Sequence, residues 1–385
     1  MYTYHKNKKD YISKEALEGS QVLDVLKEAC YYYEYENDNV KSHLHIISDL
    51  NFLQTHEETV GGVFSASGEK IQVVGVNKAQ GPNLGLGPIK KTNRVHILGL
   101  GDVGGMLLTG LRLMGAGVIS EIGIFDLDPH KVQRYEYEMN QIKACDDNSY
   151  PRVVAINQEA LFQCDVFVFT ASKGIPPVGS KVKDVRMYQL ENNTKIINHY
   201  VDQAVKAGFK GLFAVVSDPV DLLCERVLHR SQGGLKPEQV KGFGLGVMAA
   251  RASYYASQAG LKTFEEEGTA FGPHGKSLIV ANSLIDYDHD LSMVLTKKTV
   301  EANLDVRAVG YKPFIAPALS SGALSLIDCM RGRSHYSTIY INGVYYGCKN
   351  KQVGHLLFQP NQYPLPPLLL DRMEATYKEL KAFES

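Results

Sequence analysis

The sequence predicts an α/β protein in which a doubly wound parallel sheet is followed by an α+β domain and preceded by a small α/β appendage. Between residues 94 and 216, short unbroken apolar runs alternate with segments of helical periodicity. A strand that is apolar throughout is buried on both faces, as in a parallel sheet covered by helices on two sides. The length of 385 residues and the 44% hydrophobic content fit a folded chain of about two domains.

Composition excludes several classes of partner. The 41 Lys and Arg and 42 Asp and Glu give a net charge of −1, so we expect no nucleic-acid partner. No apolar run reaches the length of about 18 residues that a membrane span needs, and no apolar segment follows the lysines at the start, so we expect neither a span nor a secretion signal. The six cysteines are scattered without a CxxC pair, which favours the reducing cytoplasm.

The first 92 residues form the predicted appendage. Apolar spacing predicts a helix over 14–33, a strand over 43–47 and a hairpin over 61–74. Residues 79–88 are rich in Gly and Pro and predict a linker. We therefore place one boundary after residue 92.

A glycine motif follows the first strand of the predicted sheet. The apolar residues 95–98 lead into Gly99, Gly101 and Gly104, and residues 102–116 predict a helix. In a strand–GxGxxG–helix unit, these glycines permit a tight turn, the approach of a pyrophosphate and close helix packing. The context predicts a Rossmann domain that binds phosphates at the amino end of the helix.

Asp126 ends the next strand, which is predicted over 121–125. Its distance from Gly104 is close to the spacing of about 20 residues at which an acid binds the adenosine ribose. This arrangement favours NAD over NADP as the cofactor. The alternative is a solvated turn or a helix cap, for which Asp128 is the better candidate.

The later pattern divides the rest of the chain. Further apolar strands at 153–155, 166–169 and 212–216, with helices at 129–142 and 184–207, complete a Rossmann domain that we place at 93–240. Strands at 336–340 and 343–346 and an amphipathic helix at 366–384 belong to a substrate domain that we place at 241–385.

Five segments occur in the order of one known family: 99–104, 170–172, 215–221, 244–251 and 272–277. On these segments, the chain from about residue 93 onward resembles the lactate/malate dehydrogenase family of NAD-dependent 2-hydroxy acid dehydrogenases. The resemblance implies an oxidoreductase with NAD, a small-molecule substrate and a homodimer or homotetramer. It implies NAD contacts by Gly99, Gly101, Asp102, Val103, Gly104, Asp126, Thr170, Ala171 and Ser217.

The resemblance also implies three residue roles in the reaction. His274 matches the proton-transferring histidine, and imidazole suits this role because its ordinary pKa is about 6.5. Arg251 matches the arginine that binds the substrate carboxylate with two parallel hydrogen bonds. Arg186 is the best match to the cation of a mobile loop, with Lys181 and Lys183 as alternatives. Each role has a structural alternative. His274 could be a histidine of a surface loop, and Arg251 could form an ion pair at a subunit interface.

Two positions depart from the family's pattern. Met248 stands where the family has the aspartate that orients the catalytic histidine, and Asp218 stands where it has asparagine. Loss of the first acid should lower the proton affinity of His274, and Asp218 could restore a partner for it. Asp218 could instead face a substrate nitrogen or cap the helix that begins at Pro219.

The substrate pocket also departs from the pattern. Residues 174–178 lack the arginine with which malate enzymes bind a second carboxylate, and Lys312 stands where the family lines the side-chain end of the pocket. Dicarboxylates are therefore disfavoured, unless Lys173 or Lys181 substitutes for that arginine. We expect a 2-oxo or 2-hydroxy acid other than plain lactate or malate, with Lys312 as a substrate-binding residue.

Two other functions remain alternatives to this dehydrogenase. An imino or amino acid dehydrogenase would place Asp218 beside the substrate nitrogen, and a catalytically silent NAD-binding sensor would be consistent with Met248. His43 and His45 share a strand face but have no third ligand, and residues 286–290 lack the pattern of a calcium loop. We assign no metal.

Overall fold

The chain divides into two compact units, Met1–Leu86 and Gly87–Ser385. The computed structural model describes residues 2–6, 9–13, 21–22, 30–35, 72–77, 89–146, 149–173, 185–341, 343–361, 363 and 365–382. Of the first unit and of residues 185–187, 353 and 357 it describes the backbone alone. The domain boundaries after 92 and 240 remain predictions.

The first unit contains a five-stranded sheet in the order β3-β1-β2-β4-β5. Its strands are β1 (Tyr2–Lys6), β2 (Lys9–Ser13), β3 (Gln21–Val22), β4 (Cys30–Tyr35) and β5 (Gln72–Asn77). β1 pairs antiparallel with β2 and β3, whereas β4 pairs parallel with β2 and β5.

The helix predicted over 14–33 is wrong where the structure describes that range, because 21–22 and 30–33 belong to β3 and β4. The aromatic residues of β4 favour extended backbone once a partner strand is available, and β5 supplies one from about 40 residues away. The predicted strand over 43–47 lies outside the described residues, as does the hairpin over 61–74 apart from its last three residues, which belong to β5.

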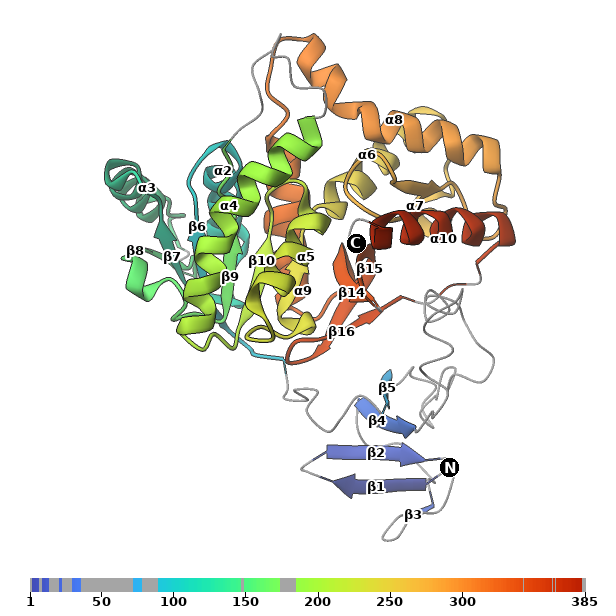
Figure 1. Ribbon diagram of the computed structural model, residues 1–385, viewed down its shortest axis with the longest axis horizontal. Helices are drawn as coiled ribbons and strands as arrows, with labels where there is room; N and C mark the ends of the chain where they lie inside the picture. The colour runs from blue at the N-terminus through green and yellow to red at the C-terminus, as the bar shows by residue number, and fades with distance from the viewer. Residues whose placement is uncertain are drawn as a thin grey trace. The chain divides into compact units, whose positions relative to one another are not determined.

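The second unit is built on a nine-stranded sheet in the order β16-β15-β14-β11-β10-β9-β6-β7-β8 (Figure 1). Its parallel strands are β6 (Asn93–Leu98), β7 (Ile119–Phe125), β8 (Arg152–Ala155), β9 (Val166–Phe169), β10 (Leu212–Val215) and β11 (Val240–Gly242). Every residue of β9 and β10 is buried, as strands covered on both faces require. The predicted doubly wound parallel sheet is confirmed.

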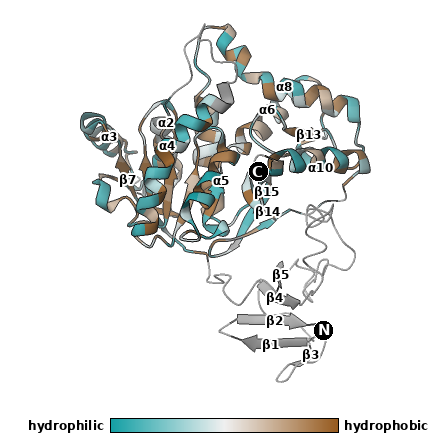
Figure 2. Cartoon of the chain, in the orientation of Figure 1, coloured by the Kyte–Doolittle hydropathy of each residue, from teal (hydrophilic) through white to brown (hydrophobic). Residues whose placement is uncertain are grey.

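Helices connect these strands and pack on the sheet (Figure 1). They are α2 (Asp102–Met114), α3 (Pro129–Gln141), α4 (Val185–Lys206) and α5 (Val220–Ser231), with the short 3₁₀ turns η3 (Gln158–Ala160) and η4 (Pro237–Gln239). Figure 2 shows polar and apolar residues mixed along these helices, as expected for helices with one face on a core and the other in water.

The carboxyl-terminal part extends the sheet and adds a helical layer. β14 (His335–Ile341), β15 (Val344–Gly354) and β16 (Leu357–Pro360) continue the sheet antiparallel from β11, and β12 (Thr269–Phe271) pairs with β13 (Ile279–Ala281). The helices are α6 (Leu245–Gln258), α7 (Phe264–Glu267), α8 (His289–Ala308), the π-helical segment η5 (Pro317–Leu324), α9 (Ser325–Met330) and α10 (Pro367–Ala382). The predicted late strand pair and closing helix are confirmed.

Two buried apolar clusters stabilise the second unit. One joins the parallel strands to α2, η5 and α9, and the other joins α6 to β12, β13 and α8. Among the described residues, no helix combines the length and the apolar character that crossing a membrane requires.

Candidate active site

The predicted site residues meet at the carboxyl edge of the parallel sheet. Gly99 follows β6, Thr170 follows β9, and Ser217 and Asp218 follow β10. Side chains connect these strand ends, because Ser217 Oγ donates to the Ala171 carbonyl oxygen at 2.7 Å. Open α/β sheets bind ligands at this edge.

His274 is held there by a carboxylate from the loop after β10. Its Nδ1 lies 2.6 Å from Asp218 Oδ1, and the two side chains are 16% and 49% exposed. Burial alone would lower the pKa of His274, but the charge of Asp218 and its hydrogen bond outweigh burial and raise that pKa. The N-cap residue of α5 is Pro219, which makes no side-chain cap hydrogen bond, so the cap role that the sequence offered for Asp218 remains a prediction.

A second carboxylate, Asp221, fixes the backbone of His274. Its Oδ2 accepts a hydrogen bond from the His274 backbone nitrogen at 2.9 Å, and its Oδ1 accepts one from Thr338 Oγ1 at 2.6 Å. Sequence reasoning missed this role, although Asp221 belongs to the segment 215–221 that carried the resemblance. The loop of His274 is thereby attached to both α5 and β14.

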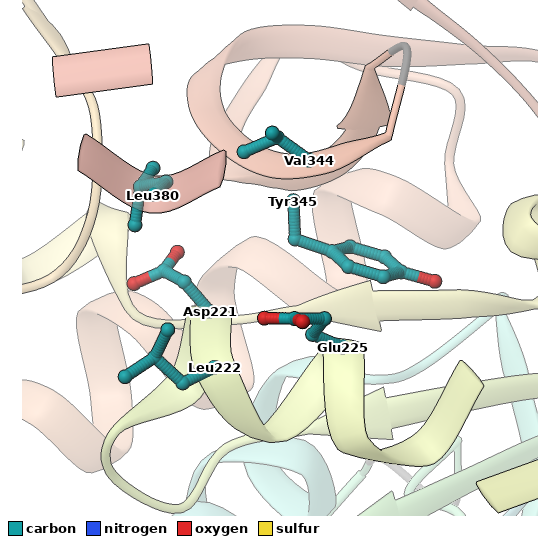
Figure 3. Close-up of a pocket in the computed structure, with 6 residues that line it drawn as sticks. All are labelled: Asp221, Leu222, Glu225, Val344, Tyr345 and Leu380. Atoms are coloured by element: carbon teal, nitrogen blue, oxygen red, sulfur yellow. The ribbon is translucent and has the colours of Figure 1, made fainter. Parts of the chain in front are cut away.

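Asp221 also borders a small cavity that is lined by Asp221, Leu222, Glu225, Val344, Tyr345 and Leu380 (Figure 3). The cavity has a volume of about 10 Å³. This is the space of roughly one water molecule, too small for an organic acid. The cavity therefore belongs to the support of the site and does not bind substrate.

Helix α6 brings Met248 and Arg251 to the same place. A Cβ at Gly244, which precedes α6, would lie 2.9 Å from the Cβ of His274. Met248 is 2% exposed, and Arg251 Nη1 donates to its Sδ at 3.6 Å. Burial lowers the pKa of the Arg251 guanidinium, and the charge of Asp218 opposes this shift. The structure therefore places His274, the predicted proton donor, and Arg251, the predicted carboxylate anchor, in one site with Asp218.

Asn193 of α4 supports the loops around this site. It is buried, its Nδ2 donates to the Asp218 carbonyl oxygen at 2.7 Å, and its Oδ1 accepts from the Lys173 backbone nitrogen at 3.1 Å. The backbone of Arg186 belongs to α4, whereas its side chain, Lys181 and Lys183 lie outside the described residues, so the loop cation remains a prediction.

The glycine motif forms the cofactor half of the site. Gly99 has φ +95°, and a Cβ at Gly104 would lie 1.9 Å from the Gly99 carbonyl oxygen, so the turn and the close approach of α2 both require glycine. A Cβ at Gly101 would meet nothing within 4 Å. Gly101 is the N-cap of α2 and provides no side-chain cap. The backbone there fits the pyrophosphate of a dinucleotide.

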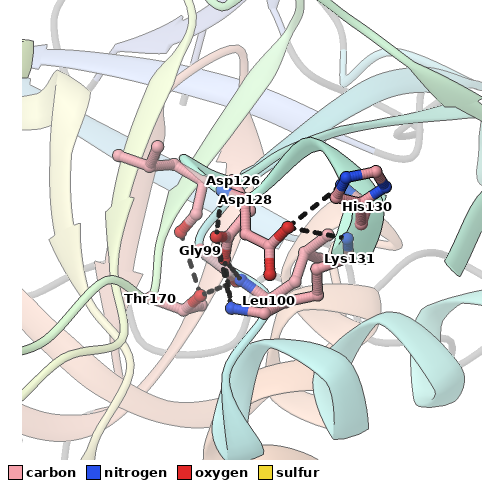
Figure 4. A network of polar contacts seen from close by, with 8 residues as sticks. Gly99, Leu100, Asp126, Asp128, His130, Lys131 and Thr170 are labelled. Atoms are coloured by element: carbon pink, nitrogen blue, oxygen red, sulfur yellow. Dashed lines mark hydrogen bonds and ion pairs between the residues drawn. The ribbon is translucent and has the colours of Figure 1, made fainter. Parts of the chain in front are cut away.

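Asp126 borders this glycine turn (Figure 4). Its Oδ2 accepts from the Leu100 backbone nitrogen at 2.7 Å, its Oδ1 accepts from the Asp128 nitrogen at 3.0 Å, and Lys131 Nζ lies 3.2 Å from Oδ1. Burial alone would raise the pKa of Asp126, but these partners lower it. Asp128 caps α3, as predicted, by accepting from the backbone nitrogens of His130 and Lys131. These partners favour the ionised form of Asp126, and its contact with a ribose hydroxyl remains a prediction.

Two further predictions concern the substrate contact of Lys312 and the absence of a metal site. Lys312 Nζ lies 3.1 Å from Asp102 Oδ2 at the amino end of α2, and its contact with a substrate remains a prediction. In the segment 286–290, Asp288 caps α8. Within the part of the chain that the structure describes, no three His, Cys, Asp or Glu side chains are grouped to hold a metal ion. His43 and His45 lie outside that part.

Known proteins are similar to this chain in the part that forms the cofactor half of the site. Residues 93–242 match the model of the lactate/malate dehydrogenase NAD binding domain, and 25% of residues are identical to the L-lactate dehydrogenase of Streptococcus suis over 318 residues, 76% of this chain and 93% of that protein. Over residues 93–242, the chain carries the NAD binding domain of the lactate/malate dehydrogenase family. The L-lactate dehydrogenase of Staphylococcus saprophyticus is 31% identical over 188 residues, which are 49% of this chain and 56% of that protein.

Solved structures of the family share the fold. The minor L-lactate dehydrogenase of Enterococcus mundtii aligns with a TM-score of 0.63 at 19% identity over 76% of this chain and 98% of that chain. The malate dehydrogenase of Archaeoglobus fulgidus in complex with NADH aligns with a TM-score of 0.62 at 18% identity over 75% and 97%. The predicted resemblance to this family, the Rossmann fold and the NAD cofactor are confirmed, and the relatives support an NAD-dependent dehydrogenase.

Proposed function

We propose that the protein transfers a hydride between NAD(H) and a 2-hydroxy/2-oxo acid, with His274 as acid and base and Asp218 as its partner. The 2.6 Å contact between His274 Nδ1 and Asp218 Oδ1 carries this proposal. Through this contact, Asp218 supplies the carboxylate that the family carries at the position of Met248. With Nδ1 bound to Asp218, Nε2 is the ring nitrogen that faces a substrate oxygen.

Proton transfer at Nε2 follows from this pair. NADH, when bound, supplies the hydride to the carbonyl carbon. Asp218 raises the pKa of His274 and so favours the protonated imidazole, which gives its Nε2 proton to the carbonyl oxygen of the 2-oxo acid as the alcohol forms. In the reverse direction the neutral Nε2 takes the hydroxyl proton. In both directions the Asp218 carboxylate stabilises the imidazolium.

Arg251 is the proposed anchor for the substrate carboxylate. Its guanidinium is partly buried beside Asp218 and Met248, where two parallel hydrogen bonds to a carboxylate fix the acid's orientation. Arg186, with Lys181 and Lys183 as alternatives, is the proposed loop cation near the carbonyl oxygen. The segment 174–178 carries no arginine, which supports a substrate other than malate.

The assembly and location are further proposals. Family membership supports a homodimer or homotetramer that acts on a small molecule. The cysteines that the structure describes are free thiols, which is consistent with the proposed cytoplasmic location.

An imino or amino acid dehydrogenase is the second candidate. The carboxylate of Asp218 is half exposed, and an anion there would stabilise a cationic substrate nitrogen. The hydrogen bond from His274 occupies one oxygen of this carboxylate, which favours the 2-oxo acid.

NADH fluorescence followed by turnover separates these candidates. The protein is titrated with NADH and NADPH and then given a panel of 2-oxo acids with and without ammonium. We expect NADH to bind and a 2-oxo acid alone to oxidise it. Oxidation that requires ammonium would support the second candidate, and NADH binding without any turnover would support a silent sensor.

A further inference from the structure

A carboxylate lies at the amino end of α2, the end at which the cofactor's pyrophosphate is expected. Asp102 is the first residue of α2 and directly follows Gly101, whose backbone faces open space. The amino end of a helix attracts anions, so the Asp102 carboxylate and a pyrophosphate compete for the same partial positive charge. Like charges at such short range repel, and a bare carboxylate here would weaken the binding of a dinucleotide.

Lys312 offsets this charge. Its Nζ lies 3.1 Å from Asp102 Oδ2, and the side chains of Lys312 and Asp102 are 81% and 50% exposed. Lys312 lies between α8 and η5, 210 residues away in the sequence. An exposed ion pair of this kind contributes little to folding, so its position at the cofactor site is the more informative property.

Close packing keeps the segment of Lys312 beside α2. A Cβ at Gly110 of α2 would lie 2.6 Å from the Cβ of Ala323 in η5, and a Cβ at Gly322 would lie 2.7 Å from Leu107 of α2. The two helical segments therefore pack closely at these glycines. This contact anchors η5, the segment that follows the loop of Lys312, against α2.

We propose that Lys312 is a residue of the cofactor site, where its ammonium neutralises Asp102 and so permits the pyrophosphate of NAD(H) to bind at the amino end of α2. This role differs from the substrate contact that the sequence predicted for Lys312. It rests on the NAD cofactor and does not depend on which substrate the enzyme reduces.

The test is a charge cycle read out by binding alone. Dissociation constants for NADH and for ADP-ribose, which carries the pyrophosphate without nicotinamide, are measured for the wild type, Lys312→Met, Asp102→Asn and the double variant. Lys312→Met should weaken both ligands about tenfold, the factor expected from one unit charge in a partly exposed site. Asp102→Asn should bind at least as tightly as the wild type, and the double variant should resemble Asp102→Asn.

Three controls make the result specific. Lys378→Met removes a lysine of similar exposure from an ion pair with Glu374 on α10 and should leave the affinities unchanged. Lys312→Arg keeps the charge and should bind NADH like the wild type. Thermal unfolding of each variant should stay at the wild-type temperature, because the pair is exposed.

Two outcomes would overturn the proposal. The first is wild-type NADH affinity in Lys312→Met, with any loss confined to the KM of a 2-oxo acid, since that would make Lys312 a substrate residue. The second is a double variant as weak as Lys312→Met, since that would mean that Lys312 acts without Asp102. A protein that binds NADH but reduces no 2-oxo acid would contradict the proposed function and leave this inference standing.

Discussion

The cofactor half and the catalytic half of the site are built from different kinds of interaction. At the glycine turn the backbone itself is the binding surface, and Gly99 and Gly104 leave no room for another residue. Around His274, charged side chains from separate elements supply the chemistry, among them Asp218 after β10 and Arg251 on α6. A backbone surface cannot move without a new fold, whereas an acid can change its position in the wall of a pocket. The departures from the family pattern at Met248 and Asp218 accordingly lie in the catalytic half.

Removal of the proton donor should separate the two halves most strongly. His274→Gln should lower kcat for 2-oxo acid reduction by about 10³-fold, within the range for a positioned general acid. The dissociation constant for NADH should change less than about twofold, because the cofactor half does not use this side chain. Stopped-flow turnover and fluorescence titration measure the two effects. His229→Gln, an exposed histidine of α5, is the matched control, and equal turnover in both variants would remove His274 from the mechanism.

Removal of the acid should have the next largest effect. Asp218→Asn should lower kcat/KM by about 10- to 100-fold, the usual cost of losing a carboxylate that orients a reacting histidine. It should also lower the pKa of His274, because the imidazolium loses its carboxylate partner. Reduction requires the protonated imidazole, so the alkaline limb of kcat/KM should move to lower pH. The surface variant Asp202→Asn, which breaks an ion pair with Arg230, should leave the profile unchanged.

The same pair makes stability depend on pH. Because Asp218 raises the pKa of His274, the pair stabilises the fold while His274 is protonated. The difference in unfolding free energy between the wild type and Asp218→Asn should therefore be present near pH 6 and vanish as the pH rises through the folded-state pKa of His274.

Adding Met248→Asp to Asp218→Asn returns the acid to the family's position and should recover part of the activity. An activity as low as that of Asp218→Asn alone would show that the two positions are not equivalent.

Alanine substitutions at two glycines of the cofactor half should change different properties, one the stability of the fold and the other the affinity for NADH. Gly104→Ala places a Cβ against the Gly99 carbonyl and should lower the free energy of unfolding by about 2 kcal/mol. Gly101→Ala meets no protein atom within 4 Å, so its unfolding free energy should stay within about 0.5 kcal/mol of the wild type. Its added methyl faces the pyrophosphate and should weaken NADH about tenfold. Chemical denaturation and NADH titration distinguish the two variants. Unchanged NADH affinity in Gly101→Ala would contradict a pyrophosphate site at the backbone of Gly101.

The ribose acid should give the smallest change. Asp126→Ala removes a hydrogen-bond acceptor of the ribose and of the Leu100 nitrogen and should weaken NADH about fivefold. The preference for NADH over NADPH should narrow, since the carboxylate no longer repels a 2′-phosphate. Asp128→Ala removes only the cap of α3 and should lower stability by about 1 kcal/mol with little effect on either affinity.

The same contrast explains how much could be predicted from the sequence. The parallel strands and the glycine turn are encoded by neighbouring residues, and the structure has both where the pattern predicts them. The contact of Asp218 with His274 joins residues 56 positions apart, so the sequence could offer it only as one of three alternatives. The role of Asp221 depends on a backbone nitrogen 53 positions away and was missed. The wrong helix over 14–33 arose because apolar spacing there cannot reveal a partner strand at 72–77.

The pKa of His274 tests the central claim most directly, because that claim assigns the work of the family's aspartate to Asp218. Histidine NMR titrations of the wild type and Asp218→Asn measure it, with His274→Gln to assign the signal. The structure predicts a wild-type pKa above the ordinary value of about 6.5 and a clear fall in Asp218→Asn. An unchanged pKa in the variant would contradict the account and leave His274 without its acid.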